Sequence, residues 1–187
     1  MLFRSPIAAA GSAAAYGLTE GEYLVVTLHR PALVDGPLLA EALAALEQVG
    51  RELPVVFPAH PRTTARMVAA GLDIASPYVK VIEPLGYFEF LSLLADAAGA
   101  LTDSGGIQEE TTYLGVPCLT LRDNTERPVT VEMGTNVLLG LAPERIAEAP
   151  AIIEQVRARD ARVPPGWDGR ASERIADVLA SASVVNS

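Results

Sequence analysis

The sequence predicts a doubly wound α/β domain, in which a parallel sheet of about six strands carries helices on both faces. From residue 23 onward, short apolar runs rich in β-branched residues alternate with longer amphipathic segments. The apolar runs have few polar positions, which is typical of strands buried on both faces. Because parallel strands joined through a helix almost always form a right-handed crossover, the alternation indicates a three-layer α/β/α arrangement.

Strands and helices follow one another in a regular order. The strands are expected at residues 23–28, 55–57, 79–82, 99–102, 117–121 and 136–139. The segment after the first strand shows the helical period, since Leu39, Leu43 and Leu46 recur on one face and Pro37 suits the first turn. Helices between and after the strands are expected over residues 37–51, 63–70, 87–95, 107–114, 128–133 and 143–159.

Composition and charge argue against several classes of protein. Half of the 187 residues are apolar and 20% are charged, as in one globular domain. The net charge of −9 argues against sequence-independent binding to nucleic acid or to an anionic membrane. Cys118 is the single cysteine, which excludes an intrachain disulfide and suggests a reducing compartment, so we expect a cytoplasmic protein. Lys80 is the single lysine and follows no glycine, which rules out a Walker A phosphate loop.

The first twenty residues differ in composition from the rest of the chain. Residues 5–19 carry no charge and are mostly small, which superficially resembles a signal peptide. Gly11 and Ser12 interrupt the alanines, so the stretch is too weakly hydrophobic for that role, and residues 1–20 are expected to be a linker or stray helix. The folded domain is then residues 21–187, including a C-terminal helix over residues 171–181. No run reaches the roughly 18 apolar residues of a membrane span.

In doubly wound sheets, ligands bind beyond the carboxyl ends of the strands, where loops lead into the next helix. The loops at these ends hold nearly all the chemically interesting side chains of this sequence. They include His29 and Arg30 after the first strand, His60 after the second, and the polar segments 103–106 and 122–127. We therefore expect the functional site at this edge of the sheet.

The segment TDSGGIQEE at residues 102–110 runs from a strand into a helix. Gly105 and Gly106 let the backbone approach a ligand, and the first N–H groups of a helix are unpaired and lie at the positive end of its dipole. Together with Ser104 they form a candidate phosphate site that needs no lysine. Taken alone, the segment is better explained as an ordinary turn in which Asp103 or Ser104 caps the helix.

Glu110 shifts the balance toward a nucleotide site. It lies one helical turn after Gly106, so it can face the phosphate-binding end and accept two hydrogen bonds from a ribose diol. Glu109 is rotated by about 100° around the helix and is expected to be solvated. Asp-Ser-Gly-Gly also surrounds the nucleophile of chymotrypsin-like proteases, but the parallel α/β pattern and the lack of a Gly-x-Ser-x-Gly elbow argue against proteolysis.

A pyrophosphate beside a chain of net charge −9 requires local cations. Thr125 is expected to cap the next helix and Arg127 to project from its first turn, where it can clamp phosphate or pair with a carboxylate such as Glu110. A surface arginine in an intrahelical pair explains the same residues equally well. His29 can donate to phosphate, although a histidine at a strand end is otherwise a satisfied structural residue. Two histidines and one cysteine without short ligand spacing do not form a zinc site, so no metal is expected.

Five further motifs accompany TDSGGIQEE, namely VVTLHR (25–30), PAHPRT (58–63), LGVPCLTLRDNTERP (114–128), GTNVLLG (134–140) and WDGRASERI (167–175). TDSGGIQEE followed by TERP at this spacing is the specific part, whereas each shorter motif is weak. With these motifs, from residue 23 to its end, the chain resembles the C-terminal half of the non-hydrolysing UDP-N-acetylglucosamine 2-epimerases.

The resemblance implies a Rossmann-like domain of a glycosyltransferase-B-like enzyme, with UDP of a UDP-sugar held mainly by this domain. The implied site comprises His29 and Arg127 as catalytic residues, and Arg30, His60, Phe90, Ser104, Gly105, Gly106 and Glu110 as substrate-binding residues. Within it, the glycine turn would hold the pyrophosphate and Glu110 the ribose. Phe90 would lie against the uracil, but Phe90, Leu91 and Leu94 at helical spacing are equally well explained as core.

The implied reaction inverts C2 of UDP-N-acetylglucosamine by eliminating UDP to a glycal intermediate and adding UDP back. Helix amides, His29 and Arg127 suit the negative charge that grows on the departing UDP. The resemblance implies no NAD and no other cofactor, and it implies a homodimer for the full-length protein.

The chain departs from the family pattern in two places. A Pro-Ala-Leu run follows Arg30, where the family usually has a Glu-Asn-like polar pair. The family's acid/base carboxylates belong to an N-terminal domain, and only about twenty residues precede the first strand here. We therefore expect a fragment that binds UDP without the proton-transfer groups; a UDP-sugar-hydrolysing epimerase, a glycosyltransferase domain and a non-catalytic UDP-sugar-binding module are the alternatives. The C-terminal helix is expected to expose an apolar face near Trp167.

Overall fold

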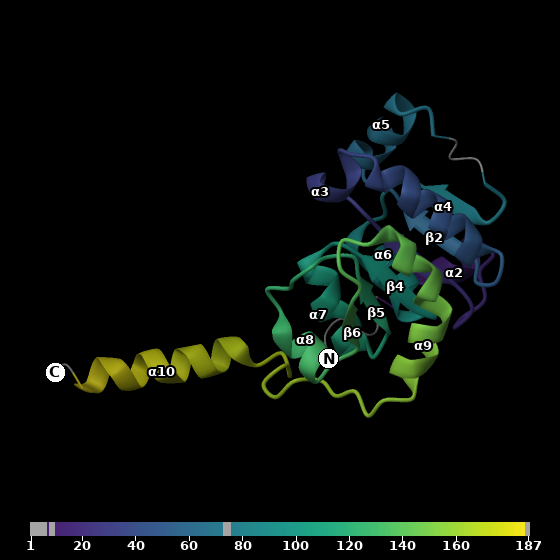
Figure 1. Cartoon of the computed structure of the whole chain (residues 1–187). Helices are drawn as coiled ribbons and strands as arrows, with labels where there is room; N and C mark the ends of the chain where they lie inside the picture. Colours follow the sequence, from purple (N-terminus) through teal and green to yellow (C-terminus); the bar gives the residue numbers. More distant parts are fainter. Residues whose placement is uncertain (1–6, 8–9, 73–75, 186–187) are drawn as a thin grey trace.

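The centre of the molecule is a six-stranded parallel sheet with the strand order β3-β2-β1-β4-β5-β6 (Figure 1). The computed structural model describes residues 7, 10–72 and 76–185. Every strand begins and ends within one residue of its predicted position, which confirms the doubly wound α/β prediction. The strands are β1 (Leu24–Thr27), β2 (Val55–Pro58), β3 (Val79–Ile82), β4 (Gly99–Thr102), β5 (Cys118–Thr120) and β6 (Asn136–Leu138).

The strand order reverses direction between β1 and β4. Thr27 at the end of β1 pairs with Thr102 at the end of β4, and their side-chain hydroxyls lie 2.7 Å apart. The chain runs outward from β1 through β2 to β3, and then returns to the other side of β1 to form β4. The loops after β1 and β4 therefore diverge, and in sheets of this kind such a divergence is where a ligand fits.

Helices cover both faces of the sheet. One face carries α4 (Leu38–Gly50), the 3₁₀ segment η1 (Pro143–Glu148) and α9 (Ala149–Arg157). The other carries α2 (Ser12–Ala15), α6 (Tyr87–Ala95) and α7 (Gly105–Leu114). Within the described residues, the other helices are α3 (Pro31–Val34), α5 (Pro61–Ala69), α8 (Pro128–Glu132) and α10 (Ala171–Val185).

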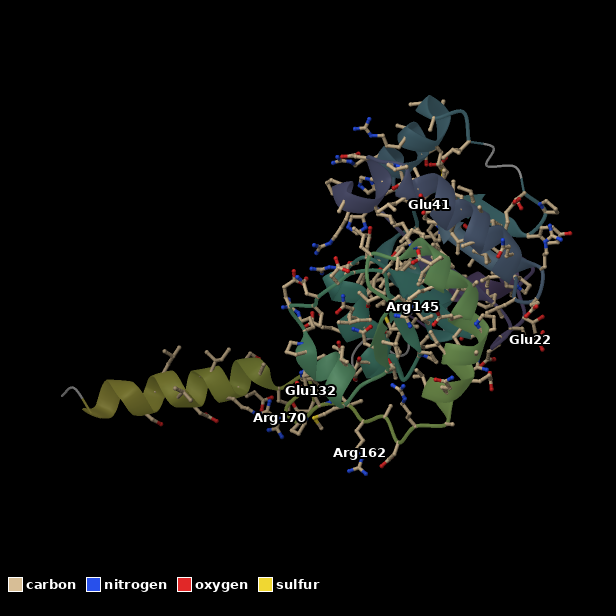
Figure 2. The ribbon with its side chains drawn as sticks, in the orientation of Figure 1. Glu22, Glu41, Glu132, Arg145, Arg162 and Arg170 are labelled. Atoms are coloured by element: carbon tan, nitrogen blue, oxygen red, sulfur yellow. The ribbon has the colours of Figure 1, made fainter. Side chains whose placement is uncertain are left out.

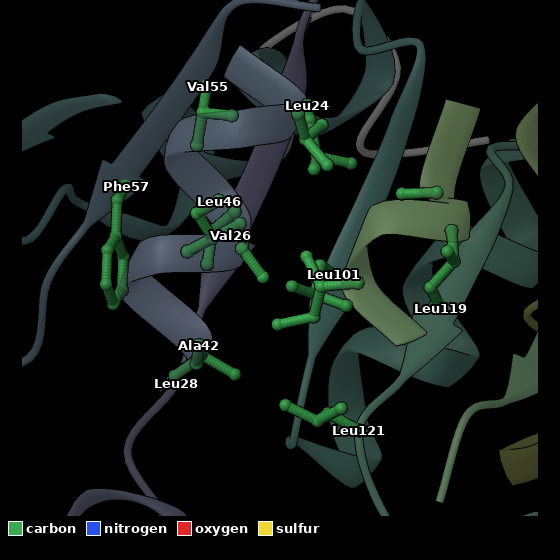
Figure 3. Close-up of a cluster of buried hydrophobic side chains, with 14 of the residues drawn as sticks. Leu24, Val26, Leu28, Ala42, Leu46, Val55, Phe57, Leu101, Leu119 and Leu121 are labelled. Carbon is green, nitrogen blue, oxygen red and sulfur yellow. The ribbon is translucent and has the colours of Figure 1, made fainter. Parts of the chain in front are cut away.

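Successive side chains of a strand pack alternately against the helices on the two faces of the sheet. Leu24 and Val26 of β1 join the core cluster under α4 and α9, whereas Val25 between them joins the cluster under α6. Figure 3 shows Val26, Leu46 of α4 and Leu101 of β4 together in the first cluster, and all three are fully buried. Full burial of a leucine side chain contributes roughly 1.5–3 kcal/mol to the stability of the fold. Because the central strands are buried under helices on both faces, they are apolar at nearly every position.

One predicted helix, over residues 143–159, is divided in two. The chain forms η1 over Pro143–Glu148 and continues as α9 over Ala149–Arg157. Pro150 lies in the first turn of α9 and has no N–H to donate to residue 146, so an α-helical ladder cannot run through it. The prediction of a single helix is therefore wrong.

The start of the chain packs on the sheet domain through α2. The Ser12 N–H donates to the Ser92 hydroxyl of α6 at 3.3 Å, and Ala13 lies in the same buried cluster as Leu91. The prediction of a linker over residues 1–20 falls partly on residues 1–6 and 8–9, outside the described residues. The division of the chain at residue 20 stays a prediction.

The last helix, α10, extends away from the rest of the domain (Figure 1). Ile175, Val178 and Leu179 on this helix are 59%, 67% and 63% exposed, as expected for an apolar face in water, while Trp167 before it is half-buried. Charged side chains such as Arg170 lie on the outside of the molecule (Figure 2). Over the described ranges, no helix combines the length and apolar character needed to cross a membrane.

Candidate functional site

The predicted site residues come from loops at one edge of the sheet, the edge formed by the carboxyl ends of the strands. His29 and Arg30 follow β1, His60 follows β2, Ser104 follows β4, and Arg127 lies in the connection after β5. Because all six strands are parallel, these loops leave the sheet on the same side. The fold thus brings together polar segments that are far apart in the sequence.

The turn after β4 leads directly into α7. Ser104 is the N-cap residue, with extended backbone angles (φ −89°, ψ 135°), and its hydroxyl does not cap the helix. Gly105 and Gly106 are the first two helical residues. Gly106 is exposed and Gly105 is half-buried, and a Cβ atom added to either would meet only an ordinary van der Waals contact, with Glu126 Oε2 at 3.8 Å or Ser104 Oγ at 4.0 Å. The N-terminus of α7 is therefore accessible to an anion.

Asp103 joins this turn to the loop after β1. Its side chain is buried, with 1% exposed, and its Oδ2 accepts hydrogen bonds from the backbone N–H groups of His29 (2.9 Å) and Arg30 (2.7 Å). It does not cap α7, so the explanation of the segment as a turn capped by Asp103 or Ser104 is wrong. The prediction missed this link because a hydrogen bond across two strands leaves no local sequence pattern.

The second oxygen of Asp103 faces the imidazole of His29. His29 Nδ1 lies 3.0 Å from Asp103 Oδ1, and the histidine side chain is 41% exposed. The Asp103 carboxylate raises the pKa of His29 above its ordinary value, although partial burial acts in the opposite direction. With Nδ1 facing the carboxylate, Nε2 is the ring nitrogen available to a ligand, and the cationic form is favoured.

His60 begins α5 as its N-cap residue. Its Nδ1 accepts a hydrogen bond from the Arg62 N–H at 3.1 Å, which leaves Nε2 as the nitrogen that can carry a proton. The rings of His60 and His29 lie 6.1 Å apart between centroids. The structure therefore places the two histidines side by side, and gives His60 a local structural role as well.

Arg127 pairs with the carboxylate that was expected to be solvated. Its Nε lies 2.8 Å from Glu109 Oε1 of α7, so the pair joins two helices and the alternative of an intrahelical pair is wrong. The Glu109 side chain is 40% exposed, so it is solvated as expected and is paired as well. Arg127 is the N-cap residue of α8 and does not lie in the first turn. The Thr125 hydroxyl accepts the Arg127 N–H at 2.9 Å, which fixes the backbone just before the helix and replaces the predicted cap.

Glu110 lies half-buried between α7 and α6. Burial raises its pKa, and a hydrogen bond with the Tyr87 hydroxyl acts in the opposite direction. Tyr87 begins α6 and is 57% exposed. Phe90, one turn later, is half-buried and packs against the core cluster that contains Leu91. A packing role for Phe90 is thus present in the structure, and its contact with uracil stays a prediction.

A small cavity lies beside Asp103, between the loops after β1 and β5. Its volume is about 160 Å³, and its lining includes Arg30, Arg122 and Asn124. Arg122 donates two hydrogen bonds to the Glu126 carboxylate at 2.7 and 2.8 Å. The half-buried side chain of Arg30 borders this cavity, so the structure places Arg30 at the same edge as His29.

The described ranges contain no group of three or more histidine, cysteine, aspartate or glutamate side chains placed to hold a metal ion. Cys118 is fully buried in β5, and burial raises the pKa of its thiol to about 11. A thiol with this pKa is protonated at neutral pH, which makes Cys118 a poor nucleophile.

Comparisons with known proteins agree with the predicted resemblance. The chain is 40% identical over 167 residues to the UDP-N-acetylglucosamine 2-epimerase of Methanocaldococcus jannaschii. It is also 40% identical over 165 residues to the UDP-2,3-diacetamido-2,3-dideoxy-D-glucuronate 2-epimerase of Pseudomonas aeruginosa. These matches cover 86% and 87% of the chain but 45% of each relative, so the chain spans about half the length of the curated relatives it matches.

Solved structures lead to the same group of proteins. The crystal structure of the M. jannaschii enzyme, in complex with UDP-GlcNAc and UDP, superposes with a TM-score of 0.74 and 37% sequence identity over 91% of this chain and 48% of that one. The family model for UDP-N-acetylglucosamine 2-epimerases matches residues 3–180. Because this match extends over almost the whole sequence, the chain belongs to the UDP-N-acetylglucosamine 2-epimerase family.

Proposed function

We propose that this chain is the UDP-binding half of an enzyme that interconverts UDP-N-acetylglucosamine and its C2 epimer. The observation that carries the proposal is the accessible N-terminus of α7, where Gly106 is exposed and Gly105 half-buried, at the point where the strand order reverses. Unpaired amides and the helix dipole at such a position favour a pyrophosphate. His29 and Arg127, from the two neighbouring loops, supply positive charge beside this helix in a chain of net charge −9.

The remaining predicted residues fit the other parts of UDP. In the proposal, the Glu110 carboxylate accepts hydrogen bonds from the ribose hydroxyls, and its bond with Tyr87 orients it. Phe90 contacts the uracil from the same helix as Tyr87. Arg30 and His60 line the substrate side of the pyrophosphate. Arg127 retains guanidinium N–H groups for phosphate besides the Nε that faces Glu109.

In the proposed reaction, UDP leaves the sugar as an anion, a glycal forms, and UDP adds back to give the epimer. This chain contributes stabilisation of the charge that develops on the leaving pyrophosphate, through the α7 amides, cationic His29 and Arg127. We propose that the groups that remove and return the proton at C2 belong to the other half of the full-length enzyme. By itself the chain is expected to bind UDP and not to epimerise a UDP-sugar.

Isothermal titration of the 187-residue chain with UDP tests this function. We expect saturable UDP binding, with uridine bound more weakly because it lacks the pyrophosphate. A melting experiment gives an independent measure, since UDP at 100 times its dissociation constant should add about 2.7 kcal/mol to the free energy of unfolding. An unchanged melting temperature at millimolar UDP, with no heat of binding, would contradict the proposal.

Two adjacent glutamates of α7 provide a matched pair of variants. Glu110→Gln removes the charge that accepts from the ribose, and hydrogen bonds to charged groups contribute about 1.5–3 kcal/mol, so UDP affinity should fall roughly 10- to 100-fold. Glu109→Gln releases Arg127 from an exposed ion pair, so UDP affinity should stay the same or rise. Equal losses in both variants, or none in either, would contradict the assignment of Glu110.

A further inference from the structure

A buried polar network links the turn before α7 to the loop that carries Arg127. Its centre is Gln108 on α7, whose side chain is 0% exposed. The Gln108 Nε2 donates to the Ser104 carbonyl at 3.2 Å, and its Oε1 accepts from the Thr125 hydroxyl and, at 3.1 Å, from Asn136 Nδ2. The Thr125 hydroxyl oxygen in turn accepts the Arg127 N–H at 2.9 Å. One side-chain amide thus connects two loops that both carry predicted site residues.

The hydrogen bonds of Asn136 fix which way the Gln108 amide points. Asn136 is 0% exposed, its Oδ1 accepts from the Thr120 hydroxyl at 2.7 Å, and its Nδ2 donates to both Gln108 and the Thr130 hydroxyl. Reversing the Gln108 amide would place its NH₂ group against the NH₂ group of Asn136, and both side chains are 0% exposed. The Nε2 group of Gln108 is therefore held toward the Ser104 carbonyl.

This hydrogen bond helps to set the direction of the first amide of α7, together with the first backbone hydrogen bond of the helix, which the Ser104 carbonyl also accepts as the N-cap carbonyl. The carbonyl of Ser104 and the N–H of Gly105 belong to one planar trans peptide, so they point in opposite directions. When Gln108 holds the carbonyl toward the helix, the Gly105 N–H points away from it, out of the helix N-terminus. Because glycine offers little resistance to rotation of this peptide plane, the Gln108 side chain supplies a second restraint besides the first helical hydrogen bond.

The other side of the network acts on the cation. The Thr125 hydroxyl is a donor to Gln108 and an acceptor for the Arg127 N–H at the same time. The Thr130 hydroxyl donates to the Arg127 carbonyl at 2.7 Å, so both sides of this residue's backbone are held. The position of the Arg127 backbone is therefore coupled, through Thr125 and Gln108, to the orientation of the Ser104–Gly105 peptide.

We propose that Gln108 is a positioning residue for the pyrophosphate site. It fixes the orientation of the first α7 amide relative to the position of Arg127. The proposal rests on the proposed function, because it needs a pyrophosphate at the N-terminus of α7. Gln108 is too deeply buried to touch a ligand, and it acts through Ser104 and Thr125. It follows that loss of either hydrogen bond should weaken UDP binding without removing any group that contacts UDP.

A double-mutant cycle on the 187-residue chain, with UDP affinity as the readout, tests the proposal. Gln108→Met keeps the length of the side chain and removes its hydrogen bonds, and Thr125→Val removes the hydroxyl. We expect each single variant to weaken UDP binding about tenfold, which corresponds to about 1.4 kcal/mol. The double variant should lose much less than the hundredfold expected of independent sites, since both changes break the same connection. Thr125→Ser keeps the hydroxyl and should restore an affinity near that of the wild type.

The controls separate positioning from general stability. Unchanged UDP affinity in Gln108→Met, additive losses in the cycle, or an equal loss in Thr125→Ser and Thr125→Val would each overturn the proposal. Thr125 is half-exposed, so the Thr125→Ser and Thr125→Val comparison remains decisive even where Gln108→Met does not fold. Absence of UDP binding by the wild-type chain would overturn the proposed function itself, whereas wild-type binding with an unaffected Gln108→Met variant overturns only this inference.

Discussion

Asp103 and His29 are 74 positions apart in the sequence, yet the buried carboxylate of one orients the imidazole and the backbone of the other. A carboxylate in this position does two things at the scale of single residues. It selects the ring nitrogen that faces outward, and it favours the charged imidazole that a phosphate prefers. The sequence predicted His29 as a phosphate donor but offered Asp103 only as one of two possible helix caps, because the partners of a buried aspartate depend on which strands are neighbours.

The pairing of His29 with Asp103 predicts a pH dependence. Since the pKa of His29 is raised above 6.5 in the folded chain, the pairing stabilises the fold fully below pH 6.5 and this contribution is lost as the pH rises through the raised pKa. UDP affinity should fall over the same range, because the neutral ring loses its charge. Asp103→Asn should move the midpoint of the His29 titration, followed by NMR, to lower pH. In His29→Gln this step in UDP affinity should be absent, and its persistence there would contradict the assignment.

At the scale of helices and strands, the two glycines that begin α7 have room for a methyl group. A Cβ atom at Gly105 would lie 3.8 Å from the nearest side-chain atom, whereas one at Gly134 would lie 2.5 Å from the Thr112 hydroxyl oxygen. Gly105 and Gly134 therefore serve different purposes. Gly134 is needed for packing, whereas packing does not require a glycine at position 105.

Alanine substitutions should separate these purposes. Gly105→Ala should leave the melting temperature unchanged or raise it slightly, because alanine favours the helix, and should lower UDP affinity because the methyl group hinders the approach of the pyrophosphate. Gly134→Ala should lower the melting temperature. Differential scanning calorimetry and UDP titration of both variants measure the two effects. A loss of stability in Gly105→Ala equal to that in Gly134→Ala would contradict this division of roles.

The sequence predicted the helices best where an apolar face decided them, and less well at their ends. α4 and α6 lie where the spacing of leucines placed them, because that face must pack on the sheet. Thr125 has the residue type of a helix cap, but its hydroxyl bonds Gln108 and the Arg127 N–H before α8 begins. Local propensity predicts which residue types occur near a helix end, but tertiary hydrogen bonds decide which of these residues caps the helix.

At the scale of the whole molecule, the pattern of buried runs was sufficient to predict the fold. Parallel strands covered on both faces tolerate almost no polar side chain. Short apolar runs such as residues 55–57 and 99–102 therefore predict buried strands of a parallel sheet. The strand order could not be derived in the same way, because an apolar run is compatible with any neighbour in the sheet. The network around Gln108 was missed for that reason, since β5 and β6 must be adjacent before Thr120 can meet Asn136.

The projecting C-terminal helix has a consequence for the dynamics of the chain. A helix of 15 residues is marginal in water when it packs on nothing, and the exposed apolar side chains Ile175 and Val178 give α10 little tertiary support. Its amide hydrogens should therefore exchange with deuterium through local fraying, long before those of β4 at the centre of the sheet, which require global opening. Hydrogen–deuterium exchange followed by mass spectrometry would reveal this, and slow exchange across residues 171–185 would mean that the helix gains protection from another surface.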